Sequence, residues 1–158
     1  MPEALTEERV LDWFGETIRA YERGDERFFD FFASDSSVFT VSSPTRIDGI
    51  EIYKSGFAPY FVGTERVSQI LSPDVRILGP DSALLTFHNR ILVKGIATNI
   101  RGTVVIQRQD DGELRFVHMH NSPLTQASAP ALAPRDLESI TVLEERVAAA
   151  SAMTGTPK

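Results

Sequence analysis

The chain has 158 residues, 42% of them hydrophobic and 24% charged, which is the size and balance of one globular domain. Its formal charge of -6 argues against a general nucleic-acid binder, and the absence of cysteine excludes disulfides and thiolate chemistry. No apolar run reaches the roughly 18 residues of a membrane span, and the first ten residues are acidic where a secretory signal is basic. We therefore expect a cytoplasmic protein.

The beginning of the chain predicts two helices. Apolar residues recur at helical spacing over 10–21, Thr6 can cap the start, and Gly24 can end the helix. Asp25 can then cap a short second helix. This second helix carries four phenylalanines within 28–32, too apolar a cluster to remain exposed, so it must cover a core.

The middle of the chain predicts a strand, a loop and a third helix. The strand is expected around 38–41, and the loop follows it. Asp48 and Glu51 form a capping-box-like pair that opens a helix with an aromatic side. From Glu65 onward, β-branched runs separated by turn residues predict a meander of four antiparallel strands, with Pro73 at a bulge or bend. The expected strands are 66–78, 82–93, 96–109 and 113–122.

The end of the chain has a different composition. Residues 125–134 are rich in proline and alanine and are expected to be a linker after a domain spanning 1–124. Apolar residues then recur at roughly helical spacing, which predicts an amphipathic helix over 135–152 and a frayed tail over 153–158. Helices before a curled antiparallel sheet give an α+β fold with the helices on one face.

Strand alternation sorts the side chains of the sheet into two faces. In the second meander strand, Phe87 and Asn89 share the helix-facing side with Ala83 and Leu85. In the last strand we expect Val117, Met119 and Asn121 on that side, and the remaining residues opposite. The residues expected on the opposite side of the last strand are Leu114, Phe116, His118 and His120.

Two asparagines end the helix-facing rows, at the edge where the chain also carries Arg101. An apolar interior that ends in convergent polar groups is typical of a small-molecule pocket. Strand parity directs Arg101 to the opposite face, so it is also a candidate surface charge. The alternative for the asparagines is a hydrogen bond to loop backbone at a strand end. The candidate ligand-binding residues are Tyr53, Phe57, Phe87, Asn89, Arg101, Met119 and Asn121.

Three histidines are expected on the outer face of the sheet. His118 and His120 have a spacing that a metal could bridge, and His88 lies on the same face two strands away. Two strand spacings of about 4.8 Å are too wide for tight coordination, so we expect neither a metal nor a cofactor. The apolar residues between the histidines favour a homodimer through this face. Its contact residues would be His88, Arg90, Val105, His118 and His120.

Four stretches carry a resemblance to a known family. They are "AYERGDERFFDFFASDSSVFTVSSP", "RIDGIEIYKSGFAPYF", "SQILSPDVRILGPDSALLTFHNR" and "RGTVVIQRQDDGELRFVHMHNSPL". The chain resembles the SnoaL-like branch of the nuclear-transport-factor-2-like superfamily, above all the association (hub) domain of calcium/calmodulin-dependent kinase II and its bacterial relatives. The resemblance covers residues 8–124. It implies a cone of curved sheet closed by helices, commonly dimeric, with a pocket inside.

The resemblance does not carry over a known active site. The pocket arginines of the hub domains fall on Asn89, near Val104 and on Asn121, so a neutral polar ligand or a weaker acid is more plausible than a strong anion. In ketosteroid-isomerase-like members the general base and the tyrosine fall near Thr40 and Thr17, and a threonine hydroxyl is far too weak a base. The usual tryptophan before the His-x-His motif is Leu114.

Three functional hypotheses remain. The first is a dimeric small-molecule-binding protein. The second is a cofactor-free isomerase, cyclase or dehydratase, whose catalytic candidates are Asp30, Tyr53, His88 and His118. The third is an assembly module in which the C-terminal helix packs on another subunit or on a partner protein. We expect neither a nucleic-acid nor a membrane partner.

Overall fold

A computed structural model describes residues 2–123 of the chain. The predicted linker, C-terminal helix and tail over 125–158 lie outside the described residues. In chain order the elements are α1 (Glu7–Arg23), η1 (Glu26–Phe31), β1 (Phe32–Phe39), β2 (Ile47–Asp48), α2 (Ile50–Phe61), β3 (Val67–Gly79), β4 (Ser82–Val93), β5 (Ile96–Arg108) and β6 (Leu114–Pro123).

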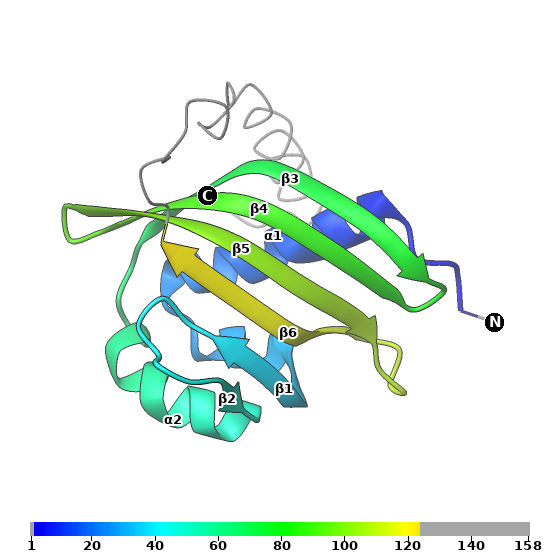
Figure 1. Cartoon of the computed structure of the whole chain (residues 1–158), viewed down its shortest axis with the longest axis horizontal. Helices are drawn as coiled ribbons and strands as arrows, with labels where there is room; N and C mark the ends of the chain where they lie inside the picture. The colour runs from blue at the N-terminus through cyan, green and yellow to red at the C-terminus, as the bar shows by residue number, and fades with distance from the viewer. Residues whose placement is uncertain (1, 124–158) are drawn as a thin grey trace.

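The six strands form one curved, open sheet in the order β2-β1-β6-β5-β4-β3. Neighbouring strands are antiparallel except for β1 and β6, which run parallel. The helix α1 crosses one face of the sheet, and α2 lies beside β1 and β2 (Figure 1). The predicted α+β fold is confirmed, and so is the four-stranded antiparallel meander. Within residues 2–123, no helix has the length and apolar character needed to cross a membrane.

Side chains and glycine fix both ends of α1 as the sequence predicts. The Thr6 hydroxyl accepts a hydrogen bond from the Arg9 backbone N–H at 3.1 Å, which satisfies one of the free donors at the helix start. Gly24 ends the helix in the left-handed conformation with φ 61°. Asp25 caps the next element by accepting from the Arg27 backbone N–H at 2.9 Å. That element is a short 3-10 helix, and it passes directly into β1 at Phe32.

Two predicted boundaries in this region are wrong. The strand expected around 38–41 begins earlier and spans Phe32–Phe39, because Phe32 and Val38 bury their side chains in the core. The third helix begins at Ile50 with Gly49 as its cap, and no side chain caps it. Asp48 instead lies in β2, where its carboxylate pairs with Arg46 at 2.6 Å.

A bulge in β6 changes the face on which one aromatic residue lies. Ile106 of β5 pairs with Phe116, but the next residue back, Val105, pairs with His118. The extra residue, Val117, reverses the alternation, so Phe116 shares a face with Met119. The prediction that Phe116 and Leu114 lie on the outer face is therefore wrong, since both are buried in the core. The predicted irregularity at Pro73 is confirmed by a register shift between Leu71 and Asp74.

Aromatic rings fill the space between the helices and the sheet. Phe116 lies 4.7 Å from Trp13 of α1 and 4.9 Å from Phe32 of β1, measured between ring centroids. Phe14 of α1 lies 4.9 Å from Phe87 of β4. These contacts hold α1 against the concave face of the sheet.

Candidate functional site

A cavity of about 530 Å³ lies inside the cone, between α1, α2 and the concave face of the sheet. Its size falls within the range of small-molecule sites. Six of the seven predicted ligand-binding residues line it: Tyr53, Phe57, Phe87, Asn89, Met119 and Asn121. The seventh, Arg101, is exposed on the outer face, where its Nε donates to the Ser122 hydroxyl at 3.2 Å.

Asn89 is buried and held by side chains rather than by loop backbone. Its Oδ1 accepts a hydrogen bond from the Ser68 hydroxyl of β3 at 2.7 Å. The Ser68 backbone N–H in turn donates to Glu22 Oε2 of α1 at 3.1 Å. Burial raises the pKa of the Glu22 carboxyl, an effect that this backbone N–H partly offsets. This chain of contacts fixes the orientation of the Asn89 side chain at the cavity wall.

Asn121 and Tyr53 bring two further polar groups to the cavity. Asn121 Oδ1 is buried and has no hydrogen-bond partner among the described residues. The Tyr53 side chain is only 6% exposed and also lines the cavity. Burial raises the pKa of Tyr53, so the hydroxyl keeps its proton and can donate. A buried polar group without a partner is costly, and a ligand could satisfy it.

The rest of the described lining is uncharged. Within residues 2–123 the cavity is lined by apolar, aromatic, hydroxyl and amide side chains, with no Asp, Glu, His, Lys or Arg among them. Thr17 and Thr40, near which the resemblance places the acid–base groups of isomerase-like members, both belong to this lining. The Thr17 hydroxyl is already engaged, donating to the Phe14 carbonyl at 2.8 Å.

Gly102 allows the floor of the cavity to be flat and aromatic. It lies opposite Phe87 on the neighbouring strand. The ring of Phe87 lies over Gly102, so that a Cβ on residue 102 would come within 2.4 Å of the ring. Only glycine at 102 leaves room for this ring position, which puts an aromatic surface between Asn89 and Asn121.

The structure separates the four catalytic candidates. Tyr53 is in the cavity, whereas Asp30 is exposed on η1. His118 lies on the outer face, where its Nδ1 is 2.7 Å from the Ser37 hydroxyl. His88 lies two strands away from His118, on β4. Its partner on β5 is Arg101, four residues from Val105, which is the β5 partner of His118. The geometry therefore does not bring an acid and a base together.

The outer-face residues predicted for a dimer do share one surface. Register places His88, Val105, His118 and His120 on the convex side of the sheet, and Arg90 at its exposed end. Phe39 of β1 adds an aromatic ring 5.1 Å from His120. No three potential metal-ligating side chains within residues 2–123 lie close enough together to hold a metal ion.

Sequence reasoning missed the residues that α2 and the strand ends bring to the mouth of the cavity. Ile52, Gly56 and Tyr60 are spaced four residues apart on one face of α2, and all three line the cavity. Their spacing was visible as a helical stripe, but it could not show which strands the stripe would face. Phe116 was missed because the bulge that turns it inward has no clear signature in the sequence.

Solved structures with the same fold include proteins of different kinds. An NTF2-like protein of unknown function from Pseudomonas putida KT2440 is 22% identical, covering 83% of this chain and 87% of that chain, with a TM-score of 0.63. The association domain of CaMKII from C. elegans is 21% identical over 72% of this chain and 92% of that chain, with a TM-score of 0.59. A ketosteroid isomerase-like protein from Erwinia carotovora atroseptica is 14% identical over 77% of this chain and 100% of that chain, with a TM-score of 0.60.

At these identities the likeness shows a shared fold and nothing about activity. No curated protein matches the chain significantly. The family model described as a SnoaL-like domain matches residues 10–126. Because this match covers well over half of the chain and the fold agrees with it, the protein belongs to the SnoaL-like family.

Proposed function

We propose that the chain binds a small, uncharged and mostly apolar molecule inside the cone cavity. The observation that carries this proposal is a described lining without Asp, Glu, His, Lys or Arg, in which Asn121 Oδ1 is buried with no partner among residues 2–123. An ionised ligand would lose its hydration without gaining a counter-charge, which is unfavourable in an apolar cavity. A ligand hydroxyl or carbonyl could instead bind Asn89, Tyr53 or Asn121.

A neutral solvatochromic dye tests the proposal. Nile red is titrated into the full chain and into the variants Gly56→Trp and Ser55→Trp. A Cβ at Gly56 meets no atom within 4 Å, so the tryptophan side chain starts from open space beside the cavity that Gly56 lines. The neighbouring Ser55 is exposed and does not line the cavity. We expect Gly56→Trp to weaken dye binding at least tenfold, about 1.4 kcal/mol, and Ser55→Trp to leave it unchanged.

Equal binding by the two tryptophan variants would place the dye outside the cavity and contradict the proposal. The preference for uncharged ligands has its own test with the anionic dye 1-anilinonaphthalene-8-sulfonate. We expect the full chain to bind this anion more weakly than Nile red. Tight anion binding that Gly56→Trp abolishes would contradict a preference for neutral molecules. Native mass spectrometry of the purified protein then identifies any molecule that stays bound.

Binding is favoured over the isomerase, cyclase or dehydratase alternative because general acid–base chemistry needs a base within hydrogen-bond reach of the substrate. Within the described lining, Tyr53 is the only one of the four catalytic candidates. Its raised pKa suits a hydrogen-bond donor and disfavours a base. The association domain of CaMKII shares the fold, and that supports self-association, which the first hypothesis expects as a dimer.

We propose a homodimer through the outer sheet face, built on Val105 and the surrounding His88, Arg90, His118 and His120. The test is the mass of the full chain by light scattering after size-exclusion chromatography. Val105→Glu places a charge in the middle of this face and should shift the protein from dimer to monomer. Ser55→Glu, on α2, serves as the control. A monomeric wild-type chain would remove the proposal.

A further inference from the structure

The hairpin formed by β4 and β5 extends beyond the strands on either side of it. On one side, β3 begins at Val67, which pairs with Leu92 of β4. On the other side, the described part of β6 ends at Pro123, which pairs with Ile100 of β5. Figure 1 shows the end of the hairpin, here called the tip (residues 92–97), projecting past the rest of the sheet.

Apolar side chains lie on both faces of the tip. Ile96 is 71% exposed and pairs with Val93, which lines the cavity, so both lie on the concave side. Leu92 is 44% exposed and pairs on the convex side with Val67, which is 52% exposed. A partner that packs flat against one face would leave the other face in water. A bilayer interface would cover both, because the tip would enter a continuous apolar medium.

The hairpin has a charge opposite to that of the whole chain. The chain carries 22 acidic residues and a formal charge of -6, yet residues 82–109 contain no Asp or Glu. The cations in the same stretch are Arg90, Lys94, Arg101 and Arg108. Arg108 pairs with Asp81 at the far end of the hairpin, whereas Arg90 and Lys94 lie near the tip. Cations beside exposed apolar side chains are typical of a surface that binds anionic lipid headgroups.

The turn at the tip places a lysine where the backbone favours other residues. Lys94 and Gly95 join the two strands, with φ of 50° and 80°. A two-residue turn with positive φ at both positions favours asparagine or aspartate before the glycine, and a lysine there is unfavourable for the backbone. A residue that opposes its own backbone conformation points to a role for its side chain, and the positive charge is what asparagine and aspartate lack.

We propose that the tip of the β4–β5 hairpin docks on a bilayer that contains anionic lipids. Leu92 and Ile96 bury their side chains at the boundary between headgroups and acyl chains, and Arg90 and Lys94 contact the lipid phosphates. A membrane partner was not expected from the sequence, because no apolar run is long enough to span a bilayer. Docking at the surface needs no such run.

Docking through the tip would also bring the cavity close to the bilayer. Ile52 and Tyr60 of α2 are 64% and 80% exposed, and they line the same cavity as Val93. An apolar ligand could then pass between the bilayer and the cavity. This exchange rests on the proposed function, whereas the docking itself does not and is tested without a ligand.

Vesicle flotation tests the docking with the full chain. The probes are vesicles of phosphatidylcholine alone and vesicles that also contain about 30% phosphatidylserine, to which we expect at least about tenfold tighter binding. Ile96→Asp should abolish this binding. Leu78→Asp should retain it, because Leu78 is 60% exposed and lies at the opposite end of the sheet. Equal binding to the two kinds of vesicle, no binding to either, or equal effects of the two aspartates would overturn the proposal.

Two substitutions of Lys94 separate the role of the charge from that of the turn. Lys94→Asn supplies a residue that the turn favours but removes the cation. We expect this variant to be more stable in urea unfolding and to bind the anionic vesicles about fivefold more weakly. Lys94→Arg keeps the cation and should keep the binding. Equal binding by the two variants would mean that the charge at the tip contacts no lipid, which contradicts the proposal.

A fluorescent reporter shows whether the tip enters the bilayer. Because the chain has no cysteine, Ile96→Cys and Leu78→Cys can each carry a single nitrobenzoxadiazole fluorophore. We expect the anionic vesicles to shift the emission of the fluorophore at 96 to shorter wavelength and to leave that at 78 unchanged. Emission at 96 that is already shifted without vesicles would mean that a second copy or another part of the chain covers the tip. That result, or no shift on vesicles, overturns docking without affecting the dye-binding test of the proposed function.

Discussion

Two glycines near the ends of α1 and α2 share a left-handed backbone but have different surroundings. At Gly24, with φ 61°, an added Cβ would lie 2.5 Å from the Thr64 carbonyl oxygen, a backbone atom that cannot move aside freely. At Gly63, with φ 78°, the Cβ would meet nothing within 4 Å. We expect Gly63→Ala to lower the free energy of unfolding by about 1 kcal/mol, the cost of the left-handed backbone alone. Gly24→Ala should cost several times more. If Gly24→Ala and Gly63→Ala lowered the free energy of unfolding equally in urea, that would contradict a steric role for Gly24.

Gly102 controls the shape of the cavity rather than the backbone. Because the Phe87 ring lies over it, Gly102→Ala must displace the ring toward the cavity, whose volume then decreases. We expect Nile red to bind this variant more weakly. Thr103→Ala, next to Gly102 on the same strand but on the outer face, is the matched control. Unchanged binding by Gly102→Ala would show that the ring moves elsewhere.

His118 gives the outer face a dependence on pH. Burial lowers the pKa of His118, and the charges of His120 and Arg46 lower it further, while Ser37 partly opposes the shift. The unfolded chain therefore takes up a proton at this site at a higher pH than the folded chain. Stability is fully present above the usual pKa of about 6.5 and is lost as pH falls from there through the lower folded value. We expect the fall in melting temperature between pH 7.5 and 5 to become smaller in His118→Gln. An unchanged fall would assign it to other groups.

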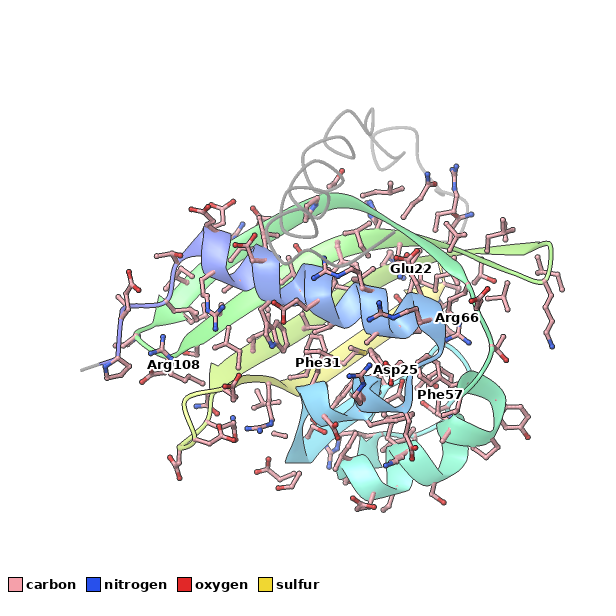
Figure 2. All side chains as sticks on the ribbon, turned by 180° about the vertical axis from the view of Figure 1, so that it is seen from behind. Glu22, Asp25, Phe31, Phe57, Arg66 and Arg108 are labelled. Atoms are coloured by element: carbon pink, nitrogen blue, oxygen red, sulfur yellow. The ribbon has the colours of Figure 1, made fainter. Side chains whose placement is uncertain are left out.

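At the scale of elements, one arginine joins the C-terminal ends of both helices. Arg66 donates from Nη1 to the Tyr21 carbonyl at 3.0 Å and from Nη2 to the Phe61 carbonyl at 3.3 Å. Its guanidinium also stacks over the rings of Tyr21 and Phe61, at 4.9 and 4.4 Å. Figure 2 shows Arg66 beside the last turn of α1. The negative ends of two helix dipoles thus provide much of the environment of this buried cation.

Removing the Arg66 guanidinium should weaken the contact between the C-terminal ends of α1 and α2 and lower the stability of the fold. We expect Arg66→Met to lower the free energy of unfolding by about 2 to 3 kcal/mol, because two buried carbonyls lose a charged donor. Arg66→Lys should recover little of this, since an ammonium cannot reproduce the planar two-carbonyl contact. Arg76→Met is the control, because Arg76 is exposed and its ion pair with Asp74 lies at the surface. Arg76→Met should lower the free energy of unfolding by less than about 0.5 kcal/mol, as measured by urea unfolding.

Local signals in the sequence were enough to predict both ends of α1, but not the face on which each side chain of β6 lies. Thr6 and Gly24 act through contacts within a few residues, so their roles could be read directly. The face on which Phe116 lies depends on a bulge set by the pairing with β5, and strict alternation gives the wrong answer there. In the same way, Asp48 looked like a helix cap until β2 and its pairing with Arg46 were known.

The candidate site was also predictable only where local patterns determine which way a side chain faces. Phe87, Asn89, Met119 and Asn121 follow from alternation within regular stretches of strand, and all four line the cavity. The placement of Arg101 outside also follows from parity. By contrast, the bond from Ser68 to Asn89 joins two strands and could not be derived from either one alone.

At the scale of the whole molecule, the fold alone does not determine function. The association domain of CaMKII and the ketosteroid isomerase-like protein both share this fold with the chain, so an argument about function has to start from the side chains of this chain. In this chain the charged side chains that the structure describes lie outside the cavity. A charge placed inside the cavity should therefore be unfavourable for the folded chain.

Asn121→Asp tests it by adding a carboxyl that differs little in shape. With no cation in the described lining, burial should raise the pKa of this carboxyl above its usual value of about 3.9. The folded chain then keeps a proton that the unfolded chain has lost, so stability falls as pH rises through that interval and stays low above it. Asn99→Asp, exposed beside Arg90, is the control without this penalty. We expect Asn121→Asp to lose at least about 1 kcal/mol more at pH 8 than at pH 5 in urea unfolding. A pH trend equal to that of Asn99→Asp would mean that water solvates residue 121, and an uncharged ligand would then have no advantage there.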